Sequence, residues 1–159
     1  MQAFGLMLAP VLICLLSLGG AEGSCPTELG LDWKENDGFC YWYSPFKTSW
    51  TQASPACGVI HPNASLASVH NLLENAWIME TFQQMDMWLG LNDVAEEGQF
   101  VWTDGSPVDF TYWAAEQPDN YHDQDCAHMP DEVEPATGQW DDELCSEERN
   151  FLCKVAATP

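Results

Sequence analysis

A short segment rich in side-chain oxygens, Glu116 to Cys126 (EQPDNYHDQDC), is the part of the sequence best suited to chemistry. Hard cations such as calcium bind roughly six to eight oxygen ligands from carboxylates, amides, backbone carbonyls and water. The segment supplies such oxygens from Gln117, Asp119, Asp123, Gln124 and Asp125, and Gly138–Asp142 (GQWDD) adds two adjacent carboxylates. Crowded carboxylates repel one another, and a divalent ion would relieve that repulsion. Residue types alone leave two readings open, a calcium site and a solvated acidic loop.

Other kinds of reactive site have little support. The acidic segment does not match the EF-hand pattern, and the absence of a Cys-x-x-Cys pair argues against zinc. None of the four histidines belongs to an H-E-x-x-H or nucleophile motif. His122 and His128 flank Cys126, where we expect solvated loop histidines rather than a metal site. The sequence therefore predicts a binding protein and not an enzyme.

The N-terminus has the layout of a secretory signal peptide. Phe4 to Leu18 is apolar but too short to span a bilayer comfortably, and small residues follow it. We expect residues 1–23 to form the signal segment, with cleavage after Ala21 or after Gly23. The alternative is an uncleaved anchor, but the flanking stop-transfer charges are absent. The length of residues 24–159 suits one domain. Because these residues contain no apolar run of spanning length, we expect the domain to be secreted and extracellular.

Cysteine usage agrees with export. The chain has seven cysteines, and Cys14 lies in the signal segment, which leaves 7 − 1 = 6 in the domain. An even number in an exported chain of this size predicts three disulfides, although counting alone does not choose the pairing. With no cysteine left over and no coiled-coil stalk, a homo-oligomer would form non-covalently through the domain surface.

The charge of the chain excludes two classes of partner. Its 25 acidic and four basic residues give a formal net charge of −21. Nucleic acids and anionic membranes both require a positive footprint, so neither is expected as a partner, and no membrane insertion is expected. The sequon Asn63-Ala64-Ser65 marks Asn63 as a surface position and a candidate for N-glycosylation.

Helical signals concentrate in the first half of the domain. Residues 47–57 predict a short helix, although Pro55 is unfavourable in a helix interior. Asn71 and Glu74 have the spacing of a capping box, and the apolar residues after them predict a helix over 71–83.

Strand signals surround these helices. Phe39–Tyr43 follows an Asp-Gly turn, and Leu66–Val69, Met87–Leu91, Gln99–Trp102 and Phe151–Val155 are further strand candidates. Trp88, Trp102, Trp113 and Trp140 lie beside strand signals, and we expect them to pack in the core. Almost no signal falls between Trp113 and Trp140, and a loop of that length is usually functional or disordered. The pattern predicts an α+β domain with two helices, small antiparallel sheets and one long loop.

Several motifs in order resemble a C-type lectin domain of the long form, over essentially all of Cys25 to Cys153. They are Trp88-Leu89-Gly90-Leu91, Trp102-Thr103-Asp104-Gly105, Gln117-Pro118-Asp119 and Trp140-Asp141-Asp142, together with the cysteine framework. The small secreted lectins of fish, found in plasma, mucus and venom, are the most similar members. The resemblance implies the C-type lectin-like fold and the disulfide pairs Cys25–Cys40, Cys57–Cys153 and Cys126–Cys145.

The resemblance also implies a site. In such lectins the long loop holds a calcium ion, whose coordination shell two vicinal sugar hydroxyls complete. By position, the metal ligands are Gln117, Asp119, Gln124, Asp141 and Asp142, and Pro118 follows a cis peptide bond. The family usually has glutamate at the position of Gln124 and asparagine at that of Asp141.

Sugar specificity follows from the same resemblance. The Gln-Pro-Asp order is associated with galactose-type sugars in the family, because it exchanges the donor and acceptor roles of the mannose-type Glu-Pro-Asn. The implied sugar contacts are Gln117, Asp119, Tyr121 and Asp141, with Tyr121 stacking on the apolar face of galactose. The sequence predicts a calcium-assisted lectin for galactose-type glycans or glycoproteins, with an agglutinating, innate-defence or venom role. The alternative is a module of this fold that binds a protein without sugar, and ice binding is less favoured because the loop is charged.

Overall fold

The structure is a computed structural model that describes residues 23–82, 86–131 and 138–158. The expected signal segment lies outside these residues, apart from Gly23. Within the described ranges, no helix is long and apolar enough to span a bilayer. The elements in chain order are η1 Glu28–Gly30, β1 Lys34–Asn36, β2 Phe39–Tyr43, α1 Trp50–Ile60, β3 Ser65–Leu66, α2 Leu72–Thr81, β4 Met87–Asn92, β5 Val101–Trp102, β6 Cys126–Met129, β7 Asp141–Glu143 and β8 Asn150–Ala156.

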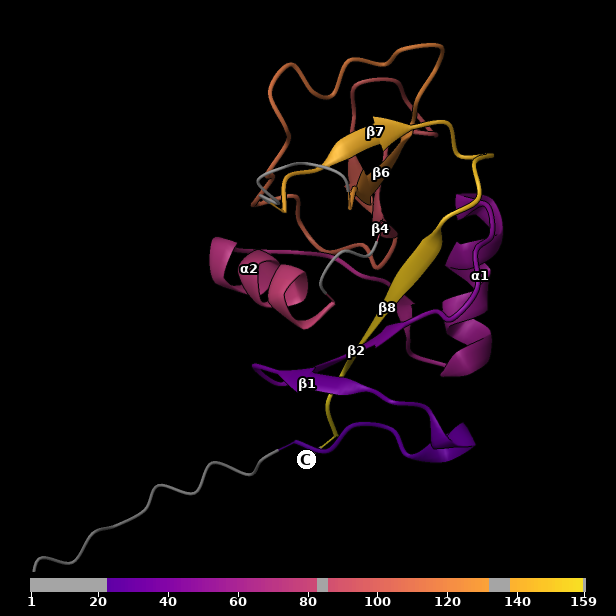
Figure 1. Cartoon of the computed structure of the whole chain (residues 1–159), viewed down its shortest axis with the longest axis vertical. Helices are drawn as coiled ribbons and strands as arrows, with labels where there is room; N and C mark the ends of the chain where they lie inside the picture. The colour runs from indigo at the N-terminus through magenta and orange to yellow at the C-terminus, as the bar shows by residue number, and fades with distance from the viewer. Residues whose placement is uncertain (1–22, 83–85, 132–137, 159) are drawn as a thin grey trace, which may run out of the picture.

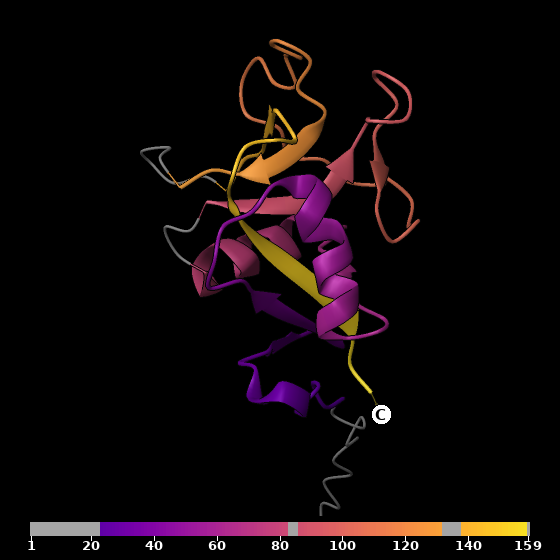
Figure 2. The same cartoon turned by 90° about the vertical axis from the view of Figure 1, so that its right-hand side faces the viewer.

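The strands form one continuous sheet in the order β1-β2-β8-β4-β6-β7, with β3 on β8 and β5 on β4. The pairs are antiparallel except for β4 and β8, which run parallel. In Figure 1, β1, β2 and β8 form the lower half, and β4, β6 and β7 the upper half. α1 and α2 lie on opposite sides of β8 (Figures 1 and 2). Two helices and a sheet with irregular connections confirm the predicted α+β class.

The two described ends of the chain lie together. The Ser24 N–H donates to the Thr158 carbonyl (2.7 Å) and the Thr158 N–H donates to the Ser24 carbonyl (3.1 Å). Both ends lie at the bottom of Figure 1, whereas the long loop rises at the top beyond β6 and β7.

The helix α2 begins where its capping residue predicts. Asn71 is the N-cap, and its side-chain oxygen accepts from the Glu74 N–H (2.9 Å). The reciprocal bond differs from a capping box, because the Glu74 carboxylate accepts from the N–H of His70 (2.8 Å) rather than Asn71. α2 ends at Thr81, and the last predicted residue, 83, lies outside the described residues.

The predicted bounds of the first helix were wrong. α1 starts at Trp50 because Thr48 is extended and bridges to Arg149, which leaves Ser49 as the N-cap. It then continues to Ile60 with Pro55 in its interior. Pro55 removes the donor for the carbonyl of Thr51, but Thr51 is exposed, so water can solvate that carbonyl.

The long loop contains a strand that the sequence reading missed. β6 is buried along its whole length, between β4 and β7. Its sequence, Cys-Ala-His-Met, lacks the β-branched and aromatic residues by which strands are recognised. Conversely, the strand expected over 66–69 is shorter than predicted, because only Ser65–Leu66 pairs with β8.

Trp140 connects the core to the start of β7. It is fully buried and contacts the rings of Trp102, Phe110 and Trp113 edge-on, with centroids 5.7–5.9 Å apart. Its Nε1–H donates to the side-chain oxygen of Asn75 on α2 (2.8 Å). Trp88 and Trp102 are buried as well, so the expected core role is confirmed for three of the four tryptophans. Trp113 is partly buried and packs against the core.

The family motif around β4 also has a packing reason. A Cβ built on Gly90 would lie 2.8 Å from the Leu66 carbonyl oxygen and 2.6 Å from Oγ1 of Thr103. The first contact is with backbone, which cannot move away cheaply. Glycine is needed there so that β3, β4 and the turn after β5 can approach closely.

The three disulfides pair as the resemblance implies, Cys25–Cys40, Cys57–Cys153 and Cys126–Cys145. The first closes the N-terminal hairpin and the second ties α1 to β8. The third joins the start of β6 to the residue after Leu144, beyond β7. Each constrains the unfolded chain, and loops of these lengths contribute about 2–4 kcal/mol per bond.

Candidate functional site

Backbone hydrogen bonds tie the start of the long loop to the segment that leads into β7. The Ala114 N–H donates to the Trp140 carbonyl (2.8 Å), and the Trp140 N–H donates to the Tyr112 carbonyl (2.8 Å). Beyond the loop, β6 pairs with β7, so that Ala127 faces Asp142. The buried Trp140 therefore holds the start of β7 beside the Gln-Pro-Asp segment.

Asp142 is the centre of the candidate site. It is 1% exposed, and its two carboxylate oxygens accept from the backbone N–H groups of Asp119 (3.0 Å) and Asn120 (2.8 Å). Asp119 in turn accepts from the Tyr121 N–H (2.9 Å). The structure thus brings Asp119 and Asp142 together from segments 23 residues apart.

Gln117 and Pro118 form the adjacent wall. Their peptide bond is cis, as the resemblance implies. The side-chain oxygen Oε1 of Gln117 is buried and has no hydrogen-bond partner among the described residues. A buried amide oxygen is costly without a partner, so a cation ligand is a fitting role for it.

Asp141 lies next to Asp142 and is partly exposed. Burial raises the pKa of its carboxyl above the usual value, and the neighbouring charges of Asp142 and Asp119 raise it further. The ring of His128, 4.0 Å from its Oδ2, acts in the opposite direction. Burial is thus the main cause of the raised pKa and crowding of like charges a further one, and a bound cation would favour the ionised carboxylate against both.

Tyr121 and Gln124, the remaining predicted residues, differ in setting. Tyr121 is 63% exposed and stacks on the ring of His122, with centroids 4.0 Å apart. Gln124 follows in the same loop, and its Nε2–H donates to Oε1 of Glu143 (2.9 Å). Loop and β7 therefore contribute all five predicted metal ligands to one end of the molecule, with Gln124 bound to a carboxylate that sequence reasoning did not consider.

A network of charges lies beneath this end of the sheet. Arg149 donates from Nη2 to Oε2 of Glu143 (2.8 Å) and from Nη1 to Oδ2 of Asp86, whose Oδ1 contacts Nδ1 of His128 (2.8 Å). Burial alone would raise the pKa of Asp86, but the contacts with His128 and Arg149 outweigh it and lower the pKa. The expectation that His128 is a solvated loop residue was wrong, since it is 4% exposed on β6. His122 is exposed, as expected.

A second acidic cluster lies near the site and was missed. Oxygens of Asp93, Glu97 and Asp125 lie within 4.8 Å of one another. Oδ2 of Asp93 accepts from the Gly98 N–H (2.8 Å), whereas its buried Oδ1 finds no hydrogen-bond partner within the described part of the chain. Burial, followed by the neighbouring acids, raises the pKa of both Glu97 and Asp125. Asp125 belongs to the oxygen-rich segment that the sequence singles out, but Asp93 and Glu97, which follow the buried strand β4, match no general motif.

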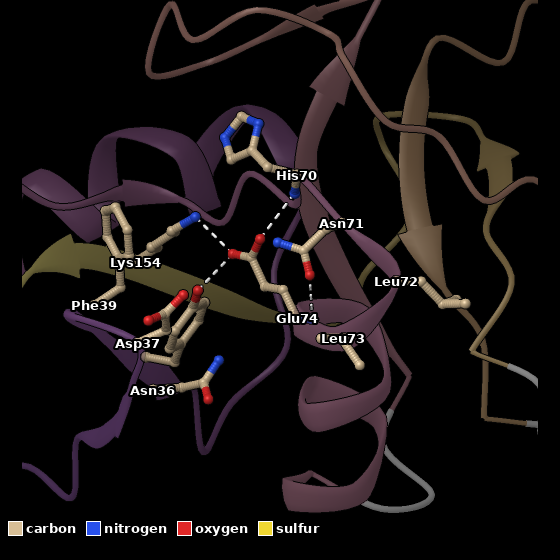
Figure 3. A pocket seen from close by; sticks show the side chains of 10 residues that line it. Asn36, Asp37, Phe39, His70, Asn71, Leu72, Leu73, Glu74 and Lys154 are labelled. Atoms are coloured by element: carbon tan, nitrogen blue, oxygen red, sulfur yellow. Dashed lines mark hydrogen bonds and ion pairs between the residues drawn. The ribbon is translucent and has the colours of Figure 1, made fainter.

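A pocket of about 500 Å³ lies elsewhere, between α2 and the β1–β2 hairpin (Figure 3). At its floor, Oε1 of Glu74 accepts from the Tyr41 hydroxyl (2.5 Å) and from Nζ of Lys154 (2.6 Å). Burial raises the pKa of Tyr41, and the hydrogen bond to Glu74 adds to the shift. Because these polar groups satisfy one another, we assign them to the stability of the domain.

Comparisons with known proteins agree with the motifs. The family model for the lectin C-type domain matches residues 46–155. The chain is 43% identical over 145 residues to lectin BRA-3 of Megabalanus rosa, covering 91% of this chain and 87% of that protein. It is 41% identical over 143 residues to the alpha-N-acetylgalactosamine-specific lectin of Patiria pectinifera, covering 84% of each.

A solved structure supports the same conclusion. The carbohydrate-recognition domain of the mouse scavenger receptor C-type lectin superimposes with a TM-score of 0.73 at 32% identity, covering 85% of this chain and 98% of that one. The two sequence relatives come from a barnacle and a starfish, so the particular likeness to fish lectins stays a prediction.

Proposed function

Because the chain belongs to the C-type lectin family, whose members bind carbohydrates without catalysis, we propose that it is a secreted, calcium-assisted lectin for galactose-type sugars. The observation that carries the proposal is the meeting of Gln117, Asp119 and Asp142 at one end of the domain. The same end presents an exposed aromatic ring, Tyr121.

The residues of the site fit calcium. They offer oxygen ligands only, which is what a hard cation requires. Gln117 has a buried oxygen without a hydrogen-bond partner in residues 23–82, 86–131 and 138–158, and burial and neighbouring acids raise the pKa of the Asp141 carboxyl. Gln117, Asp119, Gln124, Asp141 and Asp142 would hold the ion, which when bound would take two neighbouring sugar hydroxyls as further ligands.

The Asp93, Glu97 and Asp125 cluster fits a second ion on the same reasoning. Its buried oxygen Oδ1 of Asp93, like Oε1 of Gln117, accepts no hydrogen bond from the residues that the structure describes. An ion there would support the loop that carries Asp125, next to Gln124. Calcium would then stabilise the loop as well as coordinate the sugar hydroxyls.

Galactose-type specificity is supported by three observations. Gln117 and Asp119 place an amide before a carboxylate, so donor and acceptor roles toward sugar hydroxyls are distinct. The starfish relative is named for specificity toward alpha-N-acetylgalactosamine, a sugar of the galactose type. The ring of Tyr121 is accessible to the apolar face of such a sugar.

Secretion is supported by the three disulfides, which persist in oxidising compartments. Asn63 is exposed between α1 and β3, which suits a glycosylation acceptor. These features agree with the signal segment proposed for residues 1–23, with cleavage after Ala21 or Gly23.

The direct test is chromatography on galactose resin and on mannose resin, each with calcium and with EDTA. We expect retention on galactose in calcium and release by EDTA. Retention on mannose alone would overturn the specificity, and retention in EDTA would overturn the calcium mechanism. Failure to bind any glycan on an array would leave protein recognition as the function of the domain.

Calcium affinity should fall on mild acidification. The pKa values of Asp141 and Asp125 are raised, so these carboxyls take up protons at a higher pH than ordinary aspartates do. Calcium needs the ionised forms, so binding releases protons and weakens as the pH falls toward these pKa values. Calorimetry in buffers of different ionisation heat measures this release; an affinity that stays constant down to the ordinary aspartate pKa would contradict the expectation.

A further inference from the structure

The amide of Gln124 has one allowed orientation. Its side chain lies 2.9 Å from Oε1 of Glu143, whose carboxylate has only acceptor atoms when ionised. Amide nitrogen must therefore face Glu143, because amide oxygen there would meet a second acceptor. The amide oxygen Oε1 of Gln124 then points away from Glu143, since the two atoms share one planar carbon.

Glu143 is itself held in place by three donors. Its Oε1 accepts from the Leu144 N–H (2.9 Å) as well as from Gln124, and its Oε2 accepts from Nη2 of Arg149 (2.8 Å). Arg149 is bound at its other end to Asp86 and lies over the ring of Trp88, 5.3 Å from its centroid. A rigid guanidinium held at several points in turn holds Glu143 in one place.

We propose that Glu143, anchored by Arg149, is a positioning residue that turns the amide oxygen of Gln124 toward the calcium site. The inference rests on the proposed function, because it concerns how a predicted ligand is oriented. At the position where the family usually has a glutamate, this chain has the neutral amide of Gln124. The negative charge is on Glu143 of β7, the carboxylate to which that amide donates. A glutamine can serve as a calcium ligand only through its oxygen, and the hydrogen bond from its nitrogen to Glu143 turns this oxygen away from Glu143.

The test uses a change that keeps the charge. Glu143→Asp shortens the side chain by one methylene and withdraws it from Gln124. The amide then has to be ordered by calcium itself, so calcium affinity is expected to fall about three- to tenfold, the cost of ordering one side chain. Glu148→Asp is the matched control, since Glu148 is exposed on the neighbouring turn, and it is expected to leave affinity unchanged.

A double-mutant cycle shows whether Glu143 acts through Gln124. Calorimetry with calcium is done on the wild type, Glu143→Asp, Gln124→Ala and the double variant, after thermal melts in EDTA confirm that each is folded. We expect Glu143→Asp to have no further effect once Gln124 is alanine. An equal loss in both backgrounds, or no loss in either, would overturn the positioning role. Absence of calcium binding by the wild type would instead overturn the proposed function, and the inference with it.

Discussion

Replacing Glu74 by alanine is expected to lower the free energy of unfolding by about 3–5 kcal/mol. Glu74 is 8% exposed and binds Lys154, which is 5% exposed, so the variant leaves a buried ammonium without its carboxylate. It also removes the acceptor of two hydrogen bonds, those that the Tyr41 hydroxyl and the His70 N–H donate to Glu74. Urea unfolding in EDTA measures the change without a contribution from bound calcium.

A matched control is available on the same helix. Glu80 is exposed near the end of α2, and Glu80→Ala should change the unfolding free energy by less than about 0.5 kcal/mol. If Glu74→Ala were as mild as the control, the ion pair at the floor of the pocket would not be a determinant of stability. A double change of Glu74 and Lys154 to methionine should recover much of the loss, because no buried charge then stays unpaired.

Asp142→Ala is expected to weaken calcium binding tenfold or more, which corresponds to about 1.4 kcal/mol. The variant removes a carboxylate from the site and also the acceptor for the N–H groups of Asp119 and Asn120. Asp119, itself a predicted ligand, would lose its fixed position at the same time. Retention on galactose resin should be lost together with calcium affinity.

Calorimetry on Asp142→Ala needs a control of equal charge. Asp32 has an 81% exposed side chain in the N-terminal part, away from the loop, and Asp32→Ala removes the same charge. Its calcium affinity should stay close to that of the wild type, because exposed charges are screened beyond a Debye length. An Asp142→Ala affinity equal to that of Asp32→Ala would remove Asp142 from the site.

Local signals explain which elements could be predicted. Asn71 and the apolar spacing after it place α2, and the Trp-Leu-Gly-Leu run places β4, because both depend on neighbours in sequence. β6 was missed because its burial comes from strands on both sides, not from its own residue types. α1 begins later than predicted because Thr48 pairs with Arg149, a contact between residues far apart in the chain.

The candidate site shows the same division. The family motifs name Gln117, Asp119 and Asp142, and the fold brings those segments together. Glu143 and Arg149 have no motif, and their roles depend on Asp86, 63 residues from Arg149. Residue types and spacing could therefore indicate the ligands but not the groups that orient them.

The pairing of Ser24 with Thr158 has a consequence for how the domain is attached to anything else. Both described ends leave the domain at the pole opposite the long loop (Figure 1). A tag, a resin linkage or a fused partner at either end would leave the loop facing outward into solvent. Copies joined at this pole would present several loops at once, and multivalent display of this kind raises avidity without any new contact to the glycan.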